Sequence, residues 1–275
     1  IQYVKDDSDH FHPVTYGELW RQIVRMGLAL QKLGIARGDH VGIMSDNRQE
    51  WLVTDFALLS LGAVDVPRGS DSTEDEMAYI LRHADCRVTF AENPAQCEKI
   101  LSRLETIPEL ETIVLYDDYD DPEQRPDSGR VKLHSYNEVT ALVEEPNEEE
   151  VEAFEKEVAL GKSDDLATLL YTSGTTGEPK GVMLTHRAFL FQMDRVYHIL
   201  HLTHADIFLS VLPIWHSFER AVEYVVMNYG ASVAYSRPIG KIMLDDMSRL
   251  RPTWMTSVPR IWEGIRAAVY RNVSK

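Results

Sequence analysis

The 275-residue sequence predicts an α/β fold in which doubly wound, mostly parallel sheets are flanked by helices. Two observations lead to this fold class. Short apolar runs typical of strands alternate along the chain with segments that carry apolar residues at helical spacing. Strands that alternate with helices pair in parallel through right-handed crossovers, and this connection produces a doubly wound sheet. With 44% hydrophobic residues, the chain also has enough apolar surface for a core.

The first half of the chain supplies most of this pattern. Thr15 and Glu18 form a capping box, and apolar residues then recur at helical spacing until Gly34, a residue type common just after a helix end. The following elements are predicted from apolar runs, caps and breakers: strands at 40–44, 63–66, 87–91 and 112–116, with Pro67 ending the second strand, and helices that begin at Asn47, at Ser72 or Thr73, and at residue 95.

The second half resumes the alternation after a polar stretch. Residues 117–130 combine acids with proline and glycine and predict an exposed loop, while 135–160 predict one or two charged helices. The later elements are a strand at 166–171, a helix spaced by Phe189, Met193, Val196 and Leu200, and a second βα series at 207–212, 218–227 and 231–235. We therefore predict a first α/β subdomain over residues 1–165 and a second, truncated one over 166–275.

Charge distribution excludes one class of partner. The formal net charge of -16 argues against nucleic acid, because binding a phosphate backbone needs a basic surface. Residues 117–127 and 144–157 together hold -12 of this charge, and we interpret them as a solvated loop and a solvated helix face rather than as an interaction tail. The rest of the chain is near neutral and can hold an anionic ligand.

Cysteine content and hydropathy bear on the compartment. Cys86 and Cys97 are too few for a disulfide framework, and no secretory signal segment opens the sequence. The longest nearly apolar stretch, residues 56–64, is far shorter than the roughly 20 residues that a membrane-spanning helix needs. The sequence therefore predicts a cytoplasmic protein without a transmembrane helix.

The segment YTSGTTGEPKG at 171–181 carries the strongest chemical signal and follows a predicted buried strand directly. Hydroxyl groups, closely approachable glycine backbone and a lysine charge suit a polyphosphate, whereas an ordinary turn has no need of them. The segment matches neither the Walker A pattern nor the dinucleotide-binding glycine pattern. Its candidate binding residues are Thr172, Ser173, Gly174, Thr175, Thr176, Gly177 and Lys180.

This segment resembles the phosphate loop of the adenylate-forming enzymes, which include acyl-CoA synthetases, luciferases and peptide-synthetase adenylation domains. Further motifs are similar to the same family: VTYGEL at 14–19, GDHVGI at 38–43, LGAV at 61–64 and LPIWHSFER at 212–220. The combination of FER at 218–220 with SVPRIW at 257–262 is most similar to long-chain fatty-acid CoA ligases. The resemblance extends over essentially the whole chain.

The resemblance implies a two-step reaction. A carboxylate attacks the α-phosphate of ATP to give an acyl-adenylate and pyrophosphate, and the thiol of coenzyme A then displaces AMP. Like-charge repulsion between carboxylate and polyphosphate must be offset by Mg²⁺, N–H donors, hydroxyls and lysine. The resemblance assigns the loop residues named above to the β- and γ-phosphates, with Thr172 as a contact for Mg²⁺ and Lys180 as a catalytic charge.

The resemblance also places His216 at the junction between the acyl carboxylate and the α-phosphate. A histidine beside Trp215 and Phe218 can equally be a packed, hydrogen-bonded residue, and both interpretations stay open here. Glu219 and Arg220 can pair with each other or with neighbours, and the sequence assigns them no role.

Other sites are less well supported. His198, His201 and His204 could share a helix face, but the sequence shows no fourth metal ligand, and no nucleophile elbow indicates a hydrolase. Residues 260–275 carry four basic residues against Glu263 among apolar ones. We predict that this helix packs on the core with an exposed basic face, and peripheral contact with an anionic membrane is the alternative.

Several parts of the family's site have no counterpart before Lys275: the second Mg²⁺ carboxylate, the ribose-binding acid, and the mobile C-terminal domain with its lysine. We therefore expect this chain alone to have little or no ligase activity. The leading hypothesis is the ATP-binding part of a long-chain fatty-acid CoA ligase. The alternatives are an enzyme that adenylates another carboxylate, one that transfers the acyl group to an acyl carrier protein, and a non-catalytic nucleotide-binding module.

Overall fold

The computed structural model describes residues 2–5, 10–172, 178–196 and 199–273, and it divides the chain into two compact α/β units. Residues 17–190 form the large unit, and residues 1–16 with 191–275 form the small unit. The predicted boundary at 165/166 differs from this division. The strand at 166 pairs with the sheet that precedes it in sequence, and the two N-terminal strands pair with the C-terminal part of the chain.

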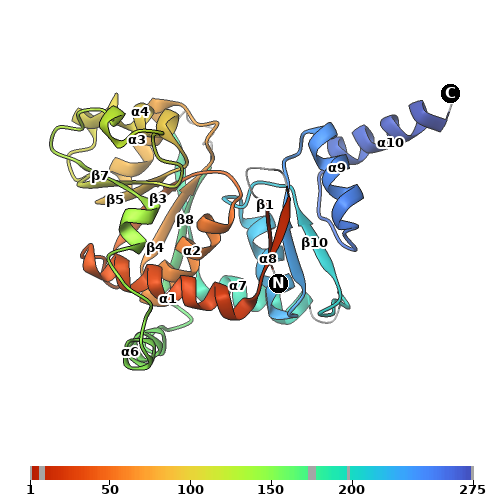
Figure 1. Ribbon diagram of the computed structural model, residues 1–275, viewed down its shortest axis with the longest axis horizontal. Coiled ribbons are helices and arrows are strands. Elements are labelled where there is room, and N and C mark those ends of the chain that lie inside the picture. The colour runs from red at the N-terminus through yellow and green to blue at the C-terminus, as the bar shows by residue number, and fades with distance from the viewer. Residues whose placement is uncertain (1, 6–9, 173–177, 197–198, 274–275) are drawn as a thin grey trace. The chain divides into compact units, whose positions relative to one another are not determined.

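The large unit is built on a seven-stranded sheet with strand order β7-β6-β5-β3-β4-β8-β9 (Figure 1). All neighbouring strands are parallel except β8 and β9, which are antiparallel. The strands are β3 (His40–Met44), β4 (Val64–Arg68), β5 (Val88–Ala91), β6 (Thr112–Leu115), β7 (Lys132–Ser135), β8 (Leu166–Thr172) and β9 (Lys180–Thr185).

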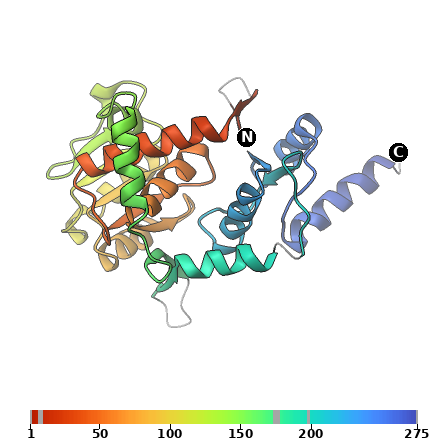
Figure 2. The same ribbon diagram turned by 90° about the horizontal axis from the view of Figure 1, so that it is seen from below.

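Helices cover both faces of this sheet, as expected when crossovers run in both directions from β3. Helices α3 and α4 pack on one face, where Leu81 and Ile100 join Val66 and Leu115 in one apolar cluster. Figures 1 and 2 show α6 crossing α1. The helices are α1 (Tyr16–Lys32), α2 (Gln49–Leu61), α3 (Glu74–His83), α4 (Pro94–Leu101), α5 (Tyr136–Thr140) and α6 (Glu148–Val158), with short 3-10 turns at Leu104–Thr106 and Pro122–Gln124. Helix α7 (His186–Val196) begins in the large unit and continues into the small unit. The doubly wound fold predicted from the sequence is confirmed.

The small unit contains a four-stranded sheet with strand order β10-β11-β1-β2. Strands β10, β11 and β1 are parallel, and β2 is antiparallel to β1. Its elements are β1 (Gln2–Lys5), β2 (Phe11–Val14), β10 (Ile207–Ser210), α8 (Ser217–Asn228), β11 (Ser232–Tyr235), α9 (Gly240–Leu250) and α10 (Pro259–Val273). Strands β1 and β2 were not predicted from the sequence, because each is only four residues long and leaves little periodic signal.

Two local predictions were wrong. Pro67 does not end β4, which continues to Arg68. The ladder between β4 and β8 consists of a single residue pair, Asp65 with Thr168, so the missing N–H of Pro67 breaks no regular pairing there. Asn47 is not the N-cap of α2 either, because Arg48 holds that position without a side-chain cap. By contrast, of the two predicted candidates, Ser72 and Thr73, it is Thr73 that caps α3, by accepting a hydrogen bond from the Glu76 N–H.

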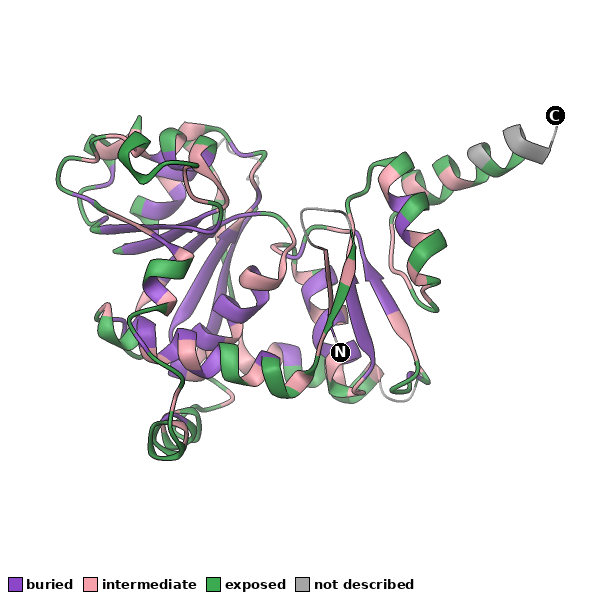
Figure 3. Ribbon diagram, in the orientation of Figure 1, coloured by how far each residue is buried: buried purple, intermediate pink, exposed green. Residues whose placement is uncertain are grey.

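The inner strands β3, β4, β5 and β6 of the large sheet are largely buried, as Figure 3 shows in purple, whereas the edge strands β7 and β9 contain exposed residues. All four residues of β5 and of β6 are buried. Covered parallel strands are expected to read as continuous apolar runs, and they do so here. The large sheet therefore provides a rigid scaffold for the connections that leave its carboxyl edge.

Candidate functional site

The predicted phosphate loop connects two strands of a hairpin at the edge of the large sheet. In the register of β8 and β9, Thr172 lies directly opposite Lys180. Both side chains are exposed. The structure thus brings together the two ends of the predicted loop. The other five candidates, Ser173, Gly174, Thr175, Thr176 and Gly177, lie outside the described residues.

The strand that leads into this loop is firmly anchored. Tyr171, the residue before Thr172, is buried, and its hydroxyl is hydrogen-bonded to Nδ1 of His83 at 2.6 Å. The Tyr79 ring stacks on His83 with ring centroids 5.4 Å apart and meets Tyr171 edge-on. Burial raises the pKa of the Tyr171 phenol, which therefore stays neutral and able to hydrogen-bond. These contacts fix the strand end on which Thr172 lies.

Arg68 is a cation beside the strand that leads into the loop, and the sequence did not predict it. The Arg68 guanidinium at the end of β4 donates to the Tyr171 carbonyl at 3.5 Å and to the Ser72 hydroxyl at 3.0 Å. It also forms an ion pair with Glu76 at 2.5 Å. The signal that could have located it is its position, because β4 and β8 are neighbouring parallel strands that end at the same sheet edge. Because Pro67 was expected to end the strand, Arg68 was not placed at the strand end.

His216 lies in the small unit and begins helix α8 as its N-cap residue. Its Nδ1 accepts a hydrogen bond from the Phe218 N–H at 3.4 Å, and its own N–H donates to the Pro213 carbonyl at 3.0 Å. An accepting Nδ1 leaves the proton of the neutral imidazole on Nε2. The side chain is exposed, so Nε2–H is a donor available to an external group. The imidazole of His216 is therefore not packed in a core.

The two residues to which the sequence assigned no role are buried. Glu219 and Arg220, in the first turn of α8, are both 0% exposed. They do not form a simple surface pair: Glu219 accepts from the Thr256 hydroxyl at 2.6 Å, and Arg220 donates to the Tyr224 hydroxyl at 2.7 Å. Burial raises the pKa of Glu219 to about 6. A glutamate in an otherwise ordinary helix start gives no sequence signal for this.

The part of the chain that the structure describes contains neither a cluster of metal ligands nor a membrane-spanning helix. No group of three or more His, Cys, Asp or Glu residues there could hold a metal ion. Of the three histidines considered from the sequence, His198 lies outside the described residues. Within the same residues no helix combines the length and apolar character needed to cross a bilayer.

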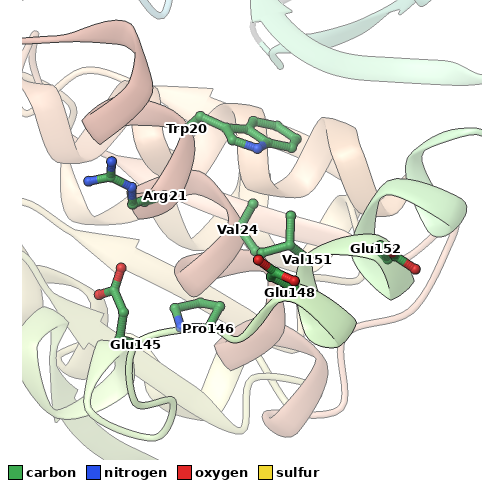
Figure 4. Close-up of a pocket in the computed structure, with 8 residues that line it drawn as sticks. All are labelled: Trp20, Arg21, Val24, Glu145, Pro146, Glu148, Val151 and Glu152. Carbon is green, nitrogen blue, oxygen red and sulfur yellow. The ribbon is translucent and has the colours of Figure 1, made fainter.

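A pocket of about 450 Å³ lies between α1 and the start of α6, together with the segment that leads into α6 (Figure 4). Trp20, Val24 and Val151 give it an apolar side, and three carboxylates, those of Glu145, Glu148 and Glu152, stand around it with Arg21. None of the predicted site residues lines this pocket. Its acidic surroundings are unsuited to a polyphosphate.

Comparisons with known proteins agree with the motifs. The family model described as AMP-binding enzyme matches residues 3–274. The chain is 30% identical to the long-chain-fatty-acid–[acyl-carrier-protein] ligase AEE15 of Arabidopsis thaliana, covering 98% of this chain and 37% of the relative. It is 32% identical to the long-chain-fatty-acid–CoA ligase FadD15 of Mycobacterium tuberculosis, covering 100% of this chain and 45% of the relative.

Among solved structures, the anthranilate CoA ligase AuaEII in complex with anthranoyl-AMP has the same fold, with a TM-score of 0.78 at 22% identity. That match covers 95% of this chain and 47% of the solved chain. The chain thus spans less than half the length of these proteins. Because the family model extends over nearly every residue, the chain belongs to the AMP-binding enzyme family.

Proposed function

We propose that this chain forms the phosphate-binding part of an enzyme that activates a long-chain fatty acid with ATP. The fatty-acid carboxylate attacks the α-phosphorus, the bond to the bridging oxygen breaks, and pyrophosphate leaves with that electron pair. The thiolate of coenzyme A then attacks the acyl carbon and releases AMP. Membership of the AMP-binding family and the names of the relatives AEE15 and FadD15 support this proposal.

The observation that carries the proposal is the cross-strand pair of Thr172 and Lys180. A hairpin connection rich in hydroxyls and glycine, closed at its ends by a hydroxyl and an ammonium, suits the oxygens of a polyphosphate. In this proposal, Lys180 stabilises charge on the departing pyrophosphate. Ser173, Gly174, Thr175, Thr176 and Gly177 donate to the β- and γ-phosphates through hydroxyl and backbone N–H groups.

His216 serves the other side of the reaction in this proposal. With Nδ1 occupied by the Phe218 N–H, the imidazole offers Nε2–H as a donor. A donor of this kind orients the attacking carboxylate or stabilises an oxygen of the α-phosphate. The N-terminus of α8, where the imidazole sits, also favours an anion.

The residues present are compatible with Mg²⁺. A nucleotide-bound Mg²⁺ usually takes most of its oxygens from phosphates and water and only one or two from the protein. The exposed Thr172 hydroxyl can supply such an oxygen. Bound Mg²⁺ would neutralise charge on the polyphosphate.

Nucleotide binding is the first test. A ligand that binds only the folded state raises stability, by about 2.7 kcal/mol at a hundredfold excess over Kd. We expect Mg²⁺–ATP to raise the Tm of the chain and Lys180→Ala to reduce that rise strongly. Lys162→Ala, which removes an exposed lysine outside the loop, is the matched control. An equal rise in Lys180→Ala and wild type would remove this loop from the site.

Palmitate-dependent exchange between ATP and pyrophosphate tests the activation step, on this chain and on any longer polypeptide that contains it. Binding without exchange in both would favour the non-catalytic nucleotide-binding module, and exchange with other acids but not palmitate would favour a different carboxylate. The name of AEE15 supports acyl carrier protein as a second candidate acceptor. Supplying coenzyme A or acyl carrier protein to the preformed acyl-adenylate distinguishes the two acceptors.

We also propose a peripheral membrane contact through α10. Ile261 and Ile265 of this helix pack partly against the core of the small unit, but Trp262, Val269 and Tyr270 remain exposed. The predicted core packing of this helix is thus only partial. Exposed apolar residues on a basic amphipathic helix suit an anionic lipid surface. Trp262→Glu should abolish sedimentation with phosphatidylglycerol vesicles, whereas equal sedimentation of variant and wild type would exclude α10 as the contact.

A further inference from the structure

The start of helix α8 departs from the usual pattern of a capped helix. Glu219 occupies the third helical position after the N-cap His216, where a glutamate normally accepts a hydrogen bond from the N-cap backbone N–H. Here that N–H donates instead to the Pro213 carbonyl at 3.0 Å. The carboxylate of Glu219 is therefore available for other partners.

Those partners lie on two separate segments. One Glu219 oxygen accepts from the Val211 N–H at 3.2 Å, and the Leu212 N–H also donates to this carboxylate. The other oxygen accepts from the Thr256 hydroxyl at 2.6 Å. Val211 and Leu212 begin the turn that ends at His216, and Thr256 lies between β10's bridge partner Trp254 and helix α10. One buried side chain thus joins the start of the His216 turn to a second segment of the chain.

The energetics favour a specific role for these contacts. Burying a carboxylate is costly unless donors meet it, and an ionised carboxylate can only accept. The Glu219 carboxylate accepts from two backbone N–H groups, those of Val211 and Leu212, and it is also hydrogen-bonded to the hydroxyls of Thr256 and Ser210. Removing the carboxylate would leave the N–H of the buried Val211 without this acceptor. The turn would then lose the contact that fixes its first residues.

A second acid on the same helix provides an internal comparison. Glu223 is also 0% exposed, but its carboxylate accepts from the side chains of Ser210 at 2.6 Å and Tyr235 at 3.3 Å. These residues belong to β10 and β11, so Glu223 joins α8 to the sheet. Glu219 differs in that it also accepts from the backbone N–H of Val211, at the start of the turn that carries His216.

We propose that Glu219 is a positioning residue, which holds the 211–216 turn from inside the small unit so that His216 keeps its N-cap geometry and presents Nε2–H outward. The use of that Nε2–H in adenylation rests on the proposed function. The geometric part of the inference does not depend on it, and the two parts are tested separately.

The geometric test observes His216 directly. In the chain labelled with ¹⁵N-histidine, the His216 signal, identified by its loss in His216→Gln, should show an unprotonated Nδ1 and a protonated Nε2. Glu219→Ala should mix the two tautomers, because the turn no longer holds the imidazole at the Phe218 N–H. Glu219→Gln keeps one acceptor oxygen and should retain most of the wild-type signature. Glu223→Gln is the matched control and should leave it unchanged.

Each outcome decides the inference. An unchanged His216 signature in Glu219→Ala, or an equal change in Glu223→Gln, would overturn it, because general packing of α8 would then explain the geometry. If Glu219→Ala does not fold, Thr256→Val takes its place, since it removes a hydrogen bond to the same carboxylate. A wild-type signature in Thr256→Val would also overturn the inference.

The catalytic consequence is measured where the wild type supports palmitate-dependent exchange. Glu219→Ala should then lower kcat at least tenfold with the KM for ATP unchanged, and Glu219→Gln should recover most of the rate. An unchanged kcat together with an altered His216 signature would reject the link to catalysis. Absence of exchange in a longer polypeptide that contains this chain would contradict the proposed function, and the histidine signature would still decide the geometric inference.

Discussion

The two units bury very different side chains. Among the described residues, the buried charged groups of the large unit are Asp55 and Asp65, whereas the smaller unit buries four: Glu219, Arg220, Glu223 and Asp246. The large sheet is surrounded by aliphatic and aromatic residues. The interior of the small unit contains hydrogen bonds and an ion pair, as between Lys5 of β1 and Asp246 of α9 at 2.7 Å.

This difference indicates how each unit is specified. Apolar packing depends on area and shape, so many contacts share the stabilisation. A buried polar network depends on every donor finding an acceptor, so a few contacts fix a single geometry. We infer that the large unit is a scaffold that tolerates changes of solution conditions, and that the small unit holds its turn by contacts that depend on charge.

The largest expected effect is the loss of a core aromatic residue in the large unit. Phe90 of β5 is fully buried and stacks on Tyr116 with ring centroids 5.4 Å apart. Phe90→Ala should lower the free energy of unfolding by about 3–5 kcal/mol through lost burial and a cavity. Urea denaturation measures this. Phe191→Ala, at a ring that is 53% exposed, is the control and should change stability by less than about 0.5 kcal/mol.

A somewhat smaller effect is expected from added volume in the same core. A Cβ at Gly42 of β3 would stand 2.4 Å from the Thr89 hydroxyl and 2.5 Å from a Leu81 methyl. Gly42→Ala should cost about 1–3 kcal/mol by overpacking. Gly264→Ala, in a helix where a Cβ meets nothing within 4 Å, is the matched control and should be neutral or stabilising. A Gly42→Ala variant as stable as the wild type would mean that the large core is not closely packed.

The same contrast explains which features of the fold could be predicted. The strands and helices of the large unit follow from apolar periodicity, and Thr73 shows that a cap can be recognised locally. The unit boundary could not be predicted, because pairing of β1 with β11 joins residues more than 200 positions apart. No local pattern encodes such pairing.

The residues of the candidate site also differ in whether the sequence could predict their contacts. The sequence motif located Thr172 and Lys180, and the register of one hairpin explains why the two ends of the loop meet. The partners of His216 and Glu219 could not be predicted. Thr256 is 37 residues from Glu219, and Arg68 reaches Tyr171 across 103 residues. Residue type alone does not distinguish a buried glutamate that holds a turn from a solvated one.

The last of the three effects, and the most specific to the small unit, is a pH dependence. Burial raises the pKa of Glu219 to about 6 in the folded chain, above the ordinary glutamate value of 4.5. Between these values the folded state keeps a proton that the unfolded state has released. Protonated Glu219 therefore contributes about 2 kcal/mol to the free energy of unfolding below about pH 4.5. This contribution is lost as the pH rises through about 6.

Glu219→Gln removes this titration while keeping the side-chain shape. Its free energy of unfolding relative to the wild type should therefore rise by about 2 kcal/mol between pH 4.5 and 7. Urea denaturation at several pH values measures the difference, and Glu105→Gln, which removes one exposed carboxylate, controls for the general loss of a negative charge. Parallel curves for wild type and Glu219→Gln would show that water reaches this carboxylate. The small unit would then lack the charge-dependent interior that distinguishes it from the large one.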